Sequence, residues 1–320
     1  MNDQDVNRII RNFVKISEED ATDLETAFAY SQSGLSKSLD WIELLKSKRI
    51  IIVSEAGAGK TYECREEQKR LWELGEPSFY FELAELSTNN IEDLLSCEEE
   101  NRFAHWINSS EIATIFLDSI DELKLTKGSF RTALNRISKA ISGNLGRVKV
   151  VITSRPTTFD LSQINSYLSP PSEENEPIFD EDSFADIAMG EHKRQRKNKE
   201  ERGPDSLVVS LLPLSNKQIA QIAKLQGIAN VDELLENIRK HGAEDFTRRP
   251  QDLIELCTDW RDHNEFRTHR EQVAYNIKTK LKARTDRKEG ASLSEDKALD
   301  GARRLALAAL LTKKLTLRHS

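Results

Sequence analysis

The sequence predicts an α/β fold in which helices cover both faces of a parallel five-stranded sheet, as a three-layer sandwich. From residue 48 onward, apolar runs typical of buried strands alternate with segments of helical periodicity. This alternation implies crossover connections, which make neighbouring strands parallel. Further helices are expected before and after this core in the sequence. They are an N-terminal helical segment over residues 1–47 and a helical lid domain over 214–290. A further helical or winged-helix element is expected to begin at 291.

Composition limits the classes of protein to which the chain can belong. Its 320 residues carry a net charge of -7, and the pI is near 5.6, which argues against a broadly basic nucleic-acid-binding surface. Three widely spaced cysteines without a C-x-x-C pair indicate a reducing cytosol rather than a disulfide framework. A signal peptide and a membrane-spanning run are both missing from the sequence, so a cytoplasmic protein is expected.

The N-terminal segment is predicted to be helical. Apolar residues recur there at helical spacing: Val6, Ile9, Ile10, Phe13 and Val14. Residues 17–20 resemble a helix start with carboxylates in the first turn. A later amphipathic segment contains Trp41 and Leu45, which are interpreted as core residues. The alternative is that they form an apolar wall for a nucleotide base, because they lie just before the loop described next.

The first strand of the predicted sheet, residues 50–53, leads into a glycine loop and then a helix that ends at Gly75. Such a loop directs backbone N–H groups at a phosphate, with the positive end of the helix dipole behind them. Lys60 supplies a charge for the outer phosphates, and the Thr61 hydroxyl a ligand for Mg²⁺. We expect a nucleotide to contact this stretch: Ser54, Glu55, Ala56, Gly57, Ala58, Gly59, Lys60, Thr61 and Tyr62. Ser54 stands where the usual motif has glycine, and an ordinary glycine turn is the alternative reading.

Four further apolar runs complete the predicted sheet, at residues 78–83, 112–118, 148–154 and 207–212. Helices are expected to begin near residue 91 and to span residues 130–141, 215–225, 231–238, 273–281 and 298–311. Pro250 suits the first turn of another helix. Residues 170–205 hold an acidic part followed by a basic one, from Lys193 to Arg202, and are interpreted as a solvated, mobile insertion.

Acidic residues follow the third of these strands. Asp118 ends the strand, and Asp121 and Glu122 come shortly after it. This is the edge at which open α/β sheets bind ligands. Asp118 is placed to hold Mg²⁺ through water, and Asp121 and Glu122 to polarise the attacking water. Taken alone, these two acids would be interpreted as the start of a loop or as a helix cap.

The next strand ends with polar residues at the same edge. Thr153 and Ser154 precede Arg155, and Pro156 halts the strand. A polar side chain there can sense the γ-phosphate, and Arg155 can stabilise the charge that spreads over it. The alternative is a surface arginine in a turn, but three strand ends in register strongly favour nucleotide binding.

These three motifs resemble those of the NACHT family, within the STAND class of P-loop NTPases. The matching stretches are residues 54–61, 116–123 and 152–156, and the resemblance covers about residues 40–260. It implies ATP rather than GTP, with Pro250 near the adenine or the phosphates. It also implies a switch that is closed with ADP and forms a homo-oligomer with ATP, commonly in defence against phage. Relatives typically carry an effector domain before the NTPase and a repeat sensor after it, so the chain is expected to be a fragment of a longer protein with an unknown trigger.

Three functional hypotheses remain open on the sequence. The first is a Mg²⁺-dependent ATPase, and the second a nucleotide-gated interaction module with negligible hydrolysis, for which the same residues would serve. The third is a replication or transposition ATPase whose basic insertion contacts DNA, which the acidic pI disfavours.

Overall fold

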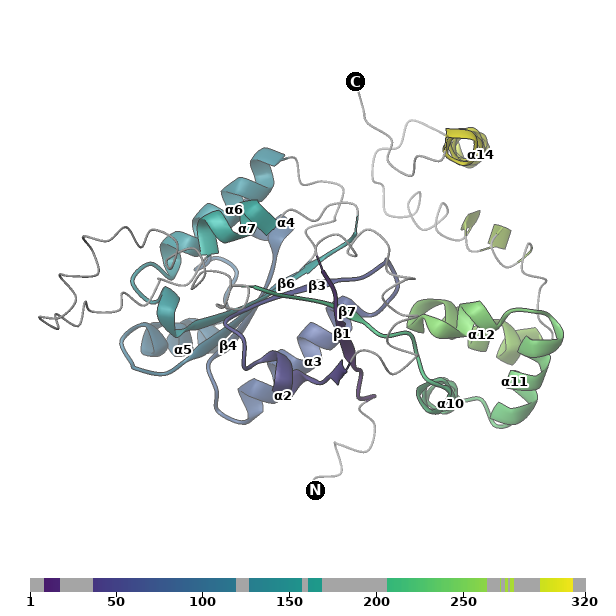
Figure 1. Cartoon of the computed structure of the whole chain (residues 1–320), viewed down its shortest axis with the longest axis horizontal. Helices are drawn as coiled ribbons and strands as arrows, with labels where there is room; N and C mark the ends of the chain where they lie inside the picture. Colours follow the sequence, from purple (N-terminus) through teal and green to yellow (C-terminus); the bar gives the residue numbers. More distant parts are fainter. Residues whose placement is uncertain are drawn as a thin grey trace, which may run out of the picture. The chain divides into compact units, whose positions relative to one another are not determined.

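The computed structural model describes residues 9–17, 37–118, 127–156, 161–168, 206–263, 271, 274–275, 277–278 and 294–312. The chain divides into two compact units, one formed by residues 11–213 and the other by residues 1–10 and 214–320. The larger unit contains a seven-stranded sheet in the order β2-β1-β7-β3-β6-β5-β4 (Figure 1). The fold is therefore α/β, as the sequence predicts.

The five expected strands are present, and neighbouring members pair in parallel. Their bounds are Arg49–Val53 for β3, Ser78–Glu82 for β4, Ala113–Asp118 for β5, Val148–Ser154 for β6 and Leu207–Leu211 for β7. Strand β6 lies between β3 and β5. Because the strands run in one direction, the motifs at their carboxyl ends meet at one edge of the sheet.

The predicted strand number and the predicted N-terminal helix are wrong for the described residues. Two short strands, β1 (Phe13–Lys15) and β2 (Ser38–Leu39), extend the sheet to seven, and both of their pairings are antiparallel. The spacing of the apolar residues suits a helix, but Phe13 and Val14 are buried in different clusters, one on each face of the sheet. A strand buried on both faces explains this pattern better. Residues 18–36, which include most of the expected helix start, lie outside the described part.

Two apolar clusters pack on opposite faces of the sheet. Along β3, Ile50 and Ile52 enter one cluster while Ile51 and Val53 enter the other. The first cluster holds residues of α2 (Trp41–Leu44) and α3 (Lys60–Glu73). Figure 1 shows these helices on one side of the sheet and α4, α6 and α7 on the other. The expected three layers are therefore present.

The second face is covered by helices that follow β4, β5 and β6. They are α4 (Leu83–Leu86), α5 (Cys97–Ile107), α6 (Lys127–Ala140) and α7 (Leu161–Leu168). The helix expected near residue 91 begins instead at Cys97, because Ser96 caps it in a reciprocal capping box with Glu99. Trp106 of α5 is fully buried beside Phe79 of β4.

The smaller unit is helical and has its own apolar core. Its elements are α10 (Asn216–Leu225), α11 (Val231–Lys240), the short 3₁₀ helix η4 (Glu244–Arg248), α12 (Pro250–His263) and α14 (Glu295–Thr312). Ser215 caps α10, and Pro250 is the first residue of α12, where a missing N–H costs no helical bond. The charged insertion at 170–205 lies outside the described residues, as does most of the helix expected over 273–281.

Candidate functional site

The loop between β3 and α3 has the backbone geometry of a phosphate cradle. Gly57 and Gly59 have φ angles of 78° and 96°, which residues other than glycine rarely adopt. Gly59 caps α3, which begins at Lys60, so the N–H groups at the start of the helix, which have no carbonyl partner within the helix, face the loop. Consecutive N–H groups at a helix N-terminus form an anion site, and this loop can therefore hold phosphate.

The Lys60 ammonium lies within this loop rather than at the protein surface. It is 9% exposed, and its Nζ donates to the carbonyls of Ser54, at 2.6 Å, and of Glu55, at 3.1 Å. The aliphatic stem thus passes back along the loop and places the charge among the loop's own backbone groups. A cation in this position can neutralise an anion held by the same loop.

Ser54, which departs from the usual motif, joins two strands of the sheet. Its Oγ lies 3.0 Å from Ser210 Oγ and accepts a 3.0 Å hydrogen bond from the Leu211 N–H. Ser54 is buried, and its own N–H donates to the Ser154 carbonyl of β6. The serine therefore ties β3 to β7 beneath the loop, which gives the departure from glycine a structural reason.

Asp118 is the centre of a buried hydrogen-bond cluster at the ends of the strands. Its Oδ2 accepts the hydroxyl of Thr61 at 2.6 Å and the hydroxyl of Tyr80 at 2.7 Å, and its Oδ1 accepts the hydroxyl of Thr153. Asp118 is only 2% exposed. The cluster brings together the first motif (Thr61), the second (Asp118) and the third (Thr153), as expected from the register of the strands.

Tyr80 was not expected at the site from the sequence, where it is one residue of an apolar strand. Burial first, and then the neighbouring charge of Asp118, raises the pKa of its phenol, so the hydroxyl remains a hydrogen-bond donor. The Arg65 guanidinium lies 4.4 Å from the Tyr80 ring centroid and pairs with Glu82 at 2.8 Å. No local signal in the sequence marks Tyr80, because its contact with Asp118 depends on the pairing of β4 with β5.

The residues around Asp118 fit a magnesium ion. The cluster offers a carboxylate and hydroxyl oxygens, which are hard ligands, and Thr61 and Asp118 are already within hydrogen-bond distance of each other. The described residues contain no group of three or more His, Cys, Asp and Glu side chains suited to a metal. Proteins usually bind Mg²⁺ through one or two side chains together with substrate phosphates and water.

Arg11 is a second residue that the sequence did not mark. It precedes β1 and is 4% exposed. Its Nη1 donates to the Ala58 carbonyl of the loop at 3.1 Å, and its Nη2 to the Leu212 carbonyl at 2.7 Å. Burial lowers the pKa of Arg11, and the nearby charge of Glu63 raises it. The N-terminal strand therefore brings a cation to the back of the loop.

Of the other residues expected near the nucleotide, two lie at strand or helix ends near the loop and two lie in the apolar core. Arg155 directly follows β6 and is half-buried, and Tyr62 is 51% exposed on α3. Trp41 and Leu45 are buried in the core cluster of their face, with the Trp41 ring 5.0 Å from that of Phe13, so the core interpretation holds.

Several predicted residues cannot be compared with the site. Asp121 and Glu122 lie outside the described residues, as does the basic stretch from Lys193 to Arg202. Pro250 belongs to the smaller unit. Within the described part of the chain, none of the helices is both long and apolar enough to cross a membrane.

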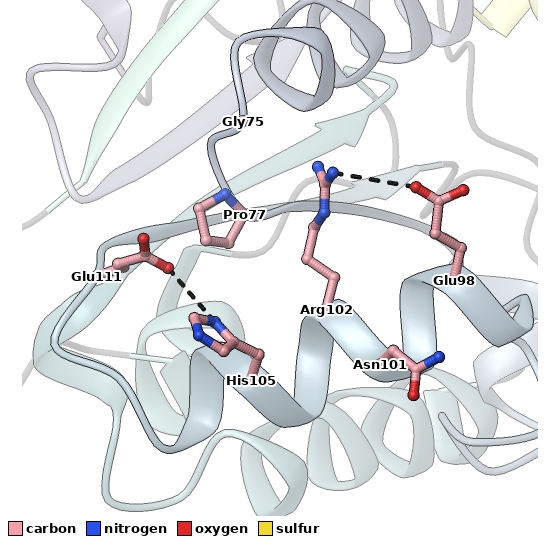
Figure 2. Close-up of a pocket in the computed structure, with 7 residues that line it drawn as sticks. All are labelled: Gly75, Pro77, Glu98, Asn101, Arg102, His105 and Glu111. Carbon is pink, nitrogen blue, oxygen red and sulfur yellow. Dashed lines mark ion pairs between the residues drawn. The ribbon is translucent and has the colours of Figure 1, made fainter.

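A separate hollow lies at the opposite edge of the sheet, where Pro77 precedes β4 and Glu111 precedes β5. Its volume is about 440 Å³. Figure 2 shows the α5 side chains along it, with Arg102 paired to Glu98 at 4.0 Å and His105 to Glu111 at 3.9 Å. Arg102 also stacks on the Trp72 ring at 3.5 Å. The side chains of Arg102 and His105 that line the hollow thus already contact neighbouring residues of the protein.

Comparison with known proteins gives a distant structural similarity. No protein-family model matches the chain, and no curated protein matches it. Among solved structures, the chain is similar to the Walker-type ATPase PABY2304 of Pyrococcus abyssi, at 11% sequence identity and a TM-score of 0.41. The alignment covers 92% of this chain and 79% of that one. At this level of similarity, a functional assignment has to rest on the geometry of the site itself.

Proposed function

We propose that this chain binds ATP and Mg²⁺ at the loop formed by residues 54–61 and hydrolyses ATP slowly. The observation that carries the proposal is the 2.6 Å hydrogen bond between Thr61 and Asp118, two residues 57 positions apart that belong to different motifs. Thr61 begins a helix behind a glycine loop, and Asp118 ends a buried strand. A hydroxyl and a carboxylate in this relation are the side chains that P-loop NTPases use for Mg²⁺.

Each residue of the site has a distinct proposed role. The N–H groups after Gly57 and Gly59 bind the phosphates, and Lys60 neutralises them. Thr61 and Asp118 would hold Mg²⁺, which when bound offsets negative charge on the phosphate oxygens. Arg155 stabilises charge at the γ-phosphate, for which such arginines are worth roughly 10³-fold in rate or more. Asp121 and Glu122 are assigned to orienting the attacking water from their place in the sequence.

The nucleotide is further proposed to control assembly, in the manner of a NACHT-type STAND switch. The three motifs support this reading, as does the division of the chain into two units with separate apolar cores. ADP would favour a closed form and ATP a homo-oligomer, with Pro250 of α12 as the proposed contact from the helical unit. A role in defence against phage follows from the same resemblance, and the trigger and effector are unknown.

Nucleotide binding is tested first. We expect ADP or ATP to copurify with the chain and to be released on denaturation, where mass spectrometry identifies it. The wild type is also titrated with a fluorescent ADP analogue, beside Lys60→Ala and Lys69→Ala. Lys69 lies on the same helix but is exposed, so its variant is the matched control. Equal affinity of the wild type and Lys60→Ala, with no copurified nucleotide, would refute the proposal.

Hydrolysis and switching are tested separately, because binding requires neither. Phosphate release that falls in Lys60→Ala but not in Lys69→Ala supports an ATPase. Tight nucleotide retention with phosphate release at background in the wild type favours the gated interaction module instead. Light scattering in ADP and in a non-hydrolysable ATP analogue then measures the switch, and identical masses in the two states count against it for this chain.

A further inference from the structure

Arg11 connects the phosphate loop to the end of a strand. It is almost completely buried, and its guanidinium donates to two main-chain carbonyls. One carbonyl belongs to Ala58 in the phosphate loop and the other to Leu212, just after β7. A guanidinium has a rigid planar fork of donors, so it fixes the distance and direction between the groups it bridges.

The bond to Ala58 bears directly on the phosphate-binding surface of the loop. In the trans peptide between Ala58 and Gly59, the carbonyl and the N–H point in opposite directions. By holding the Ala58 carbonyl, Arg11 therefore also holds the Gly59 N–H away from itself. Gly59 has a positive φ and no side chain to restrain it, so this peptide would otherwise be among the freest in the loop.

The bond to Leu212 lies beside a point where the chain passes between its two units. These passages occur between Ile10 and Arg11, and between Pro213 and Leu214. Arg11 stands at the first passage and holds the carbonyl of Leu212 near the second. Within the smaller unit, the Ile10 carbonyl accepts the side-chain amide of Gln218 at 2.5 Å. The residue that fixes the loop is thus covalently next to one that is tied to α10.

We propose that Arg11 is a positioning residue for the phosphate loop, which makes the affinity for nucleotide depend on the attachment of the N-terminal strand to the sheet. This inference rests on the proposed nucleotide site. Any movement that loosens β1 from β7 releases the Ala58 carbonyl and weakens phosphate binding. By thermodynamic linkage, bound nucleotide must in turn strengthen the attachment of β1. Arg11 therefore couples the phosphate loop to the pairing of β1 with β7.

The first test compares substitutions of Arg11 in the full chain. Arg11→Met removes both bonds, whereas Arg11→Lys keeps the charge and one donor direction. We expect Arg11→Met to weaken the binding of fluorescent ADP roughly tenfold, because it loses a hydrogen bond from a charged donor. Arg11→Lys should bind fluorescent ADP more tightly than Arg11→Met but less tightly than the wild type. In phosphate-release assays KM should rise while kcat stays near the wild-type value.

Arg49→Met is the matched control, because Arg49 is another buried arginine that donates to main-chain carbonyls. It lies at the start of β3, away from the loop. Equal ADP affinity of Arg11→Met and the wild type, or an equal loss in Arg11→Met and Arg49→Met, would overturn the role of Arg11. Failure of the wild type to bind any nucleotide would instead reject the site as a whole.

The second test uses only the wild-type chain, so it does not depend on whether a variant folds. Hydrogen exchange is measured on the wild-type peptides that contain residues 11–16 and 207–212, with and without ADP. These peptides include the pairings Ile16 N–H to Val208 O, at 3.1 Å, and Leu212 N–H to Asn12 O, at 2.9 Å. We expect ADP to slow exchange in both peptides. Slower exchange in α3 with no change in the two peptides would contradict the coupling.

Discussion

The phenol of Tyr80 donates a 2.7 Å hydrogen bond to Asp118 Oδ2, the same oxygen that accepts the hydroxyl of Thr61. Tyr80 comes from β4, at the edge of the sheet, and Thr61 from α3. The proposed Mg²⁺ ligand is thus oriented by a side chain from outside the three motifs. Such support is common for metal ligands, whose position depends on the groups that hydrogen-bond to them.

Tyr80→Phe is expected to weaken the effect of Mg²⁺ on nucleotide binding. The change removes one hydrogen bond to a charged carboxylate, worth about 1.5–3 kcal/mol, and leaves the ring in place. Titrating Mg²⁺ at fixed fluorescent ADP should therefore give a midpoint roughly tenfold higher or more. Tyr167→Phe on α7 is the control for loss of a phenol hydroxyl. An unchanged Mg²⁺ midpoint in Tyr80→Phe would exclude this role.

Ser54→Ala is expected to lower stability while nucleotide binding is retained. The variant loses the bond to Ser210 Oγ and leaves the buried Leu211 N–H without its acceptor, at a cost of about 1–3 kcal/mol. Thermal melts should show a decrease of several degrees, roughly 2–4 °C per kcal/mol. Ser54→Gly restores the usual motif and should lose the same bonds. If Ser54→Ala loses nucleotide affinity without loss of stability, the hydroxyl belongs to the binding site instead.

Arg49→Met is expected to destabilise the sheet without changing ADP affinity. The Arg49 guanidinium donates to the carbonyls of Lys48, Val148, Leu145 and Leu168 at the edge opposite the loop. Burial lowers the pKa of Arg49 to about 10, so the group is still charged at neutral pH. Leaving several carbonyls unpaired should cost about 3 kcal/mol or more, measured by urea unfolding. A shift below about 1 kcal/mol would mean that water replaces these bonds.

The three cysteines are expected to react with thiol reagents at very different rates. Cys97 is exposed, whereas Cys64 and Cys257 are buried. Burial raises the pKa of both buried thiols, that of Cys257 to about 12, and the thiolate is the reactive form. Labelling followed by mass spectrometry should modify Cys97 first, with Cys97→Ser as the control.

Nucleotide should further distinguish the two buried thiols. Cys64 lies on α3 directly after the phosphate loop, and Cys257 lies in the helical unit. A ligand that binds the folded state suppresses the opening that exposes a buried group. ADP is therefore expected to slow labelling of Cys64 more than that of Cys257. Equal slowing would show that opening is global rather than confined to the sheet unit.

The sequence predicted the central strands because each is a continuous apolar run bounded by turn residues. Ile50–Val53 is buried on both faces, so its pattern is unambiguous. It also predicted that Thr61, Asp118 and Thr153 would meet, because parallel strands end at one edge. The N-terminal strand was missed because Phe13 and Val14 belong to a helix-like spacing, and only pairing with β7, far along the chain, determines their structure.

Tyr80 and Arg11 could not be predicted for a related reason. Each contacts the site through a hydrogen bond that depends on where its strand pairs, and neither belongs to a short motif. Tyr80 reads as one more apolar position of β4, and Arg11 as a charged residue between the apolar positions of the expected N-terminal helix. Residues that support a site from neighbouring strands leave no local pattern in a single sequence.

The position of β1 has a consequence for the order of folding. Arg11 and Leu212 are 201 residues apart in the chain, so the bond between them closes most of the sheet unit into one loop. Contacts of such long range form late, because the entropy of loop closure opposes them until the intervening strands have assembled. During synthesis, β1 must wait for β7 to emerge. The phosphate loop therefore gains its last support only after nearly the whole sheet has been made.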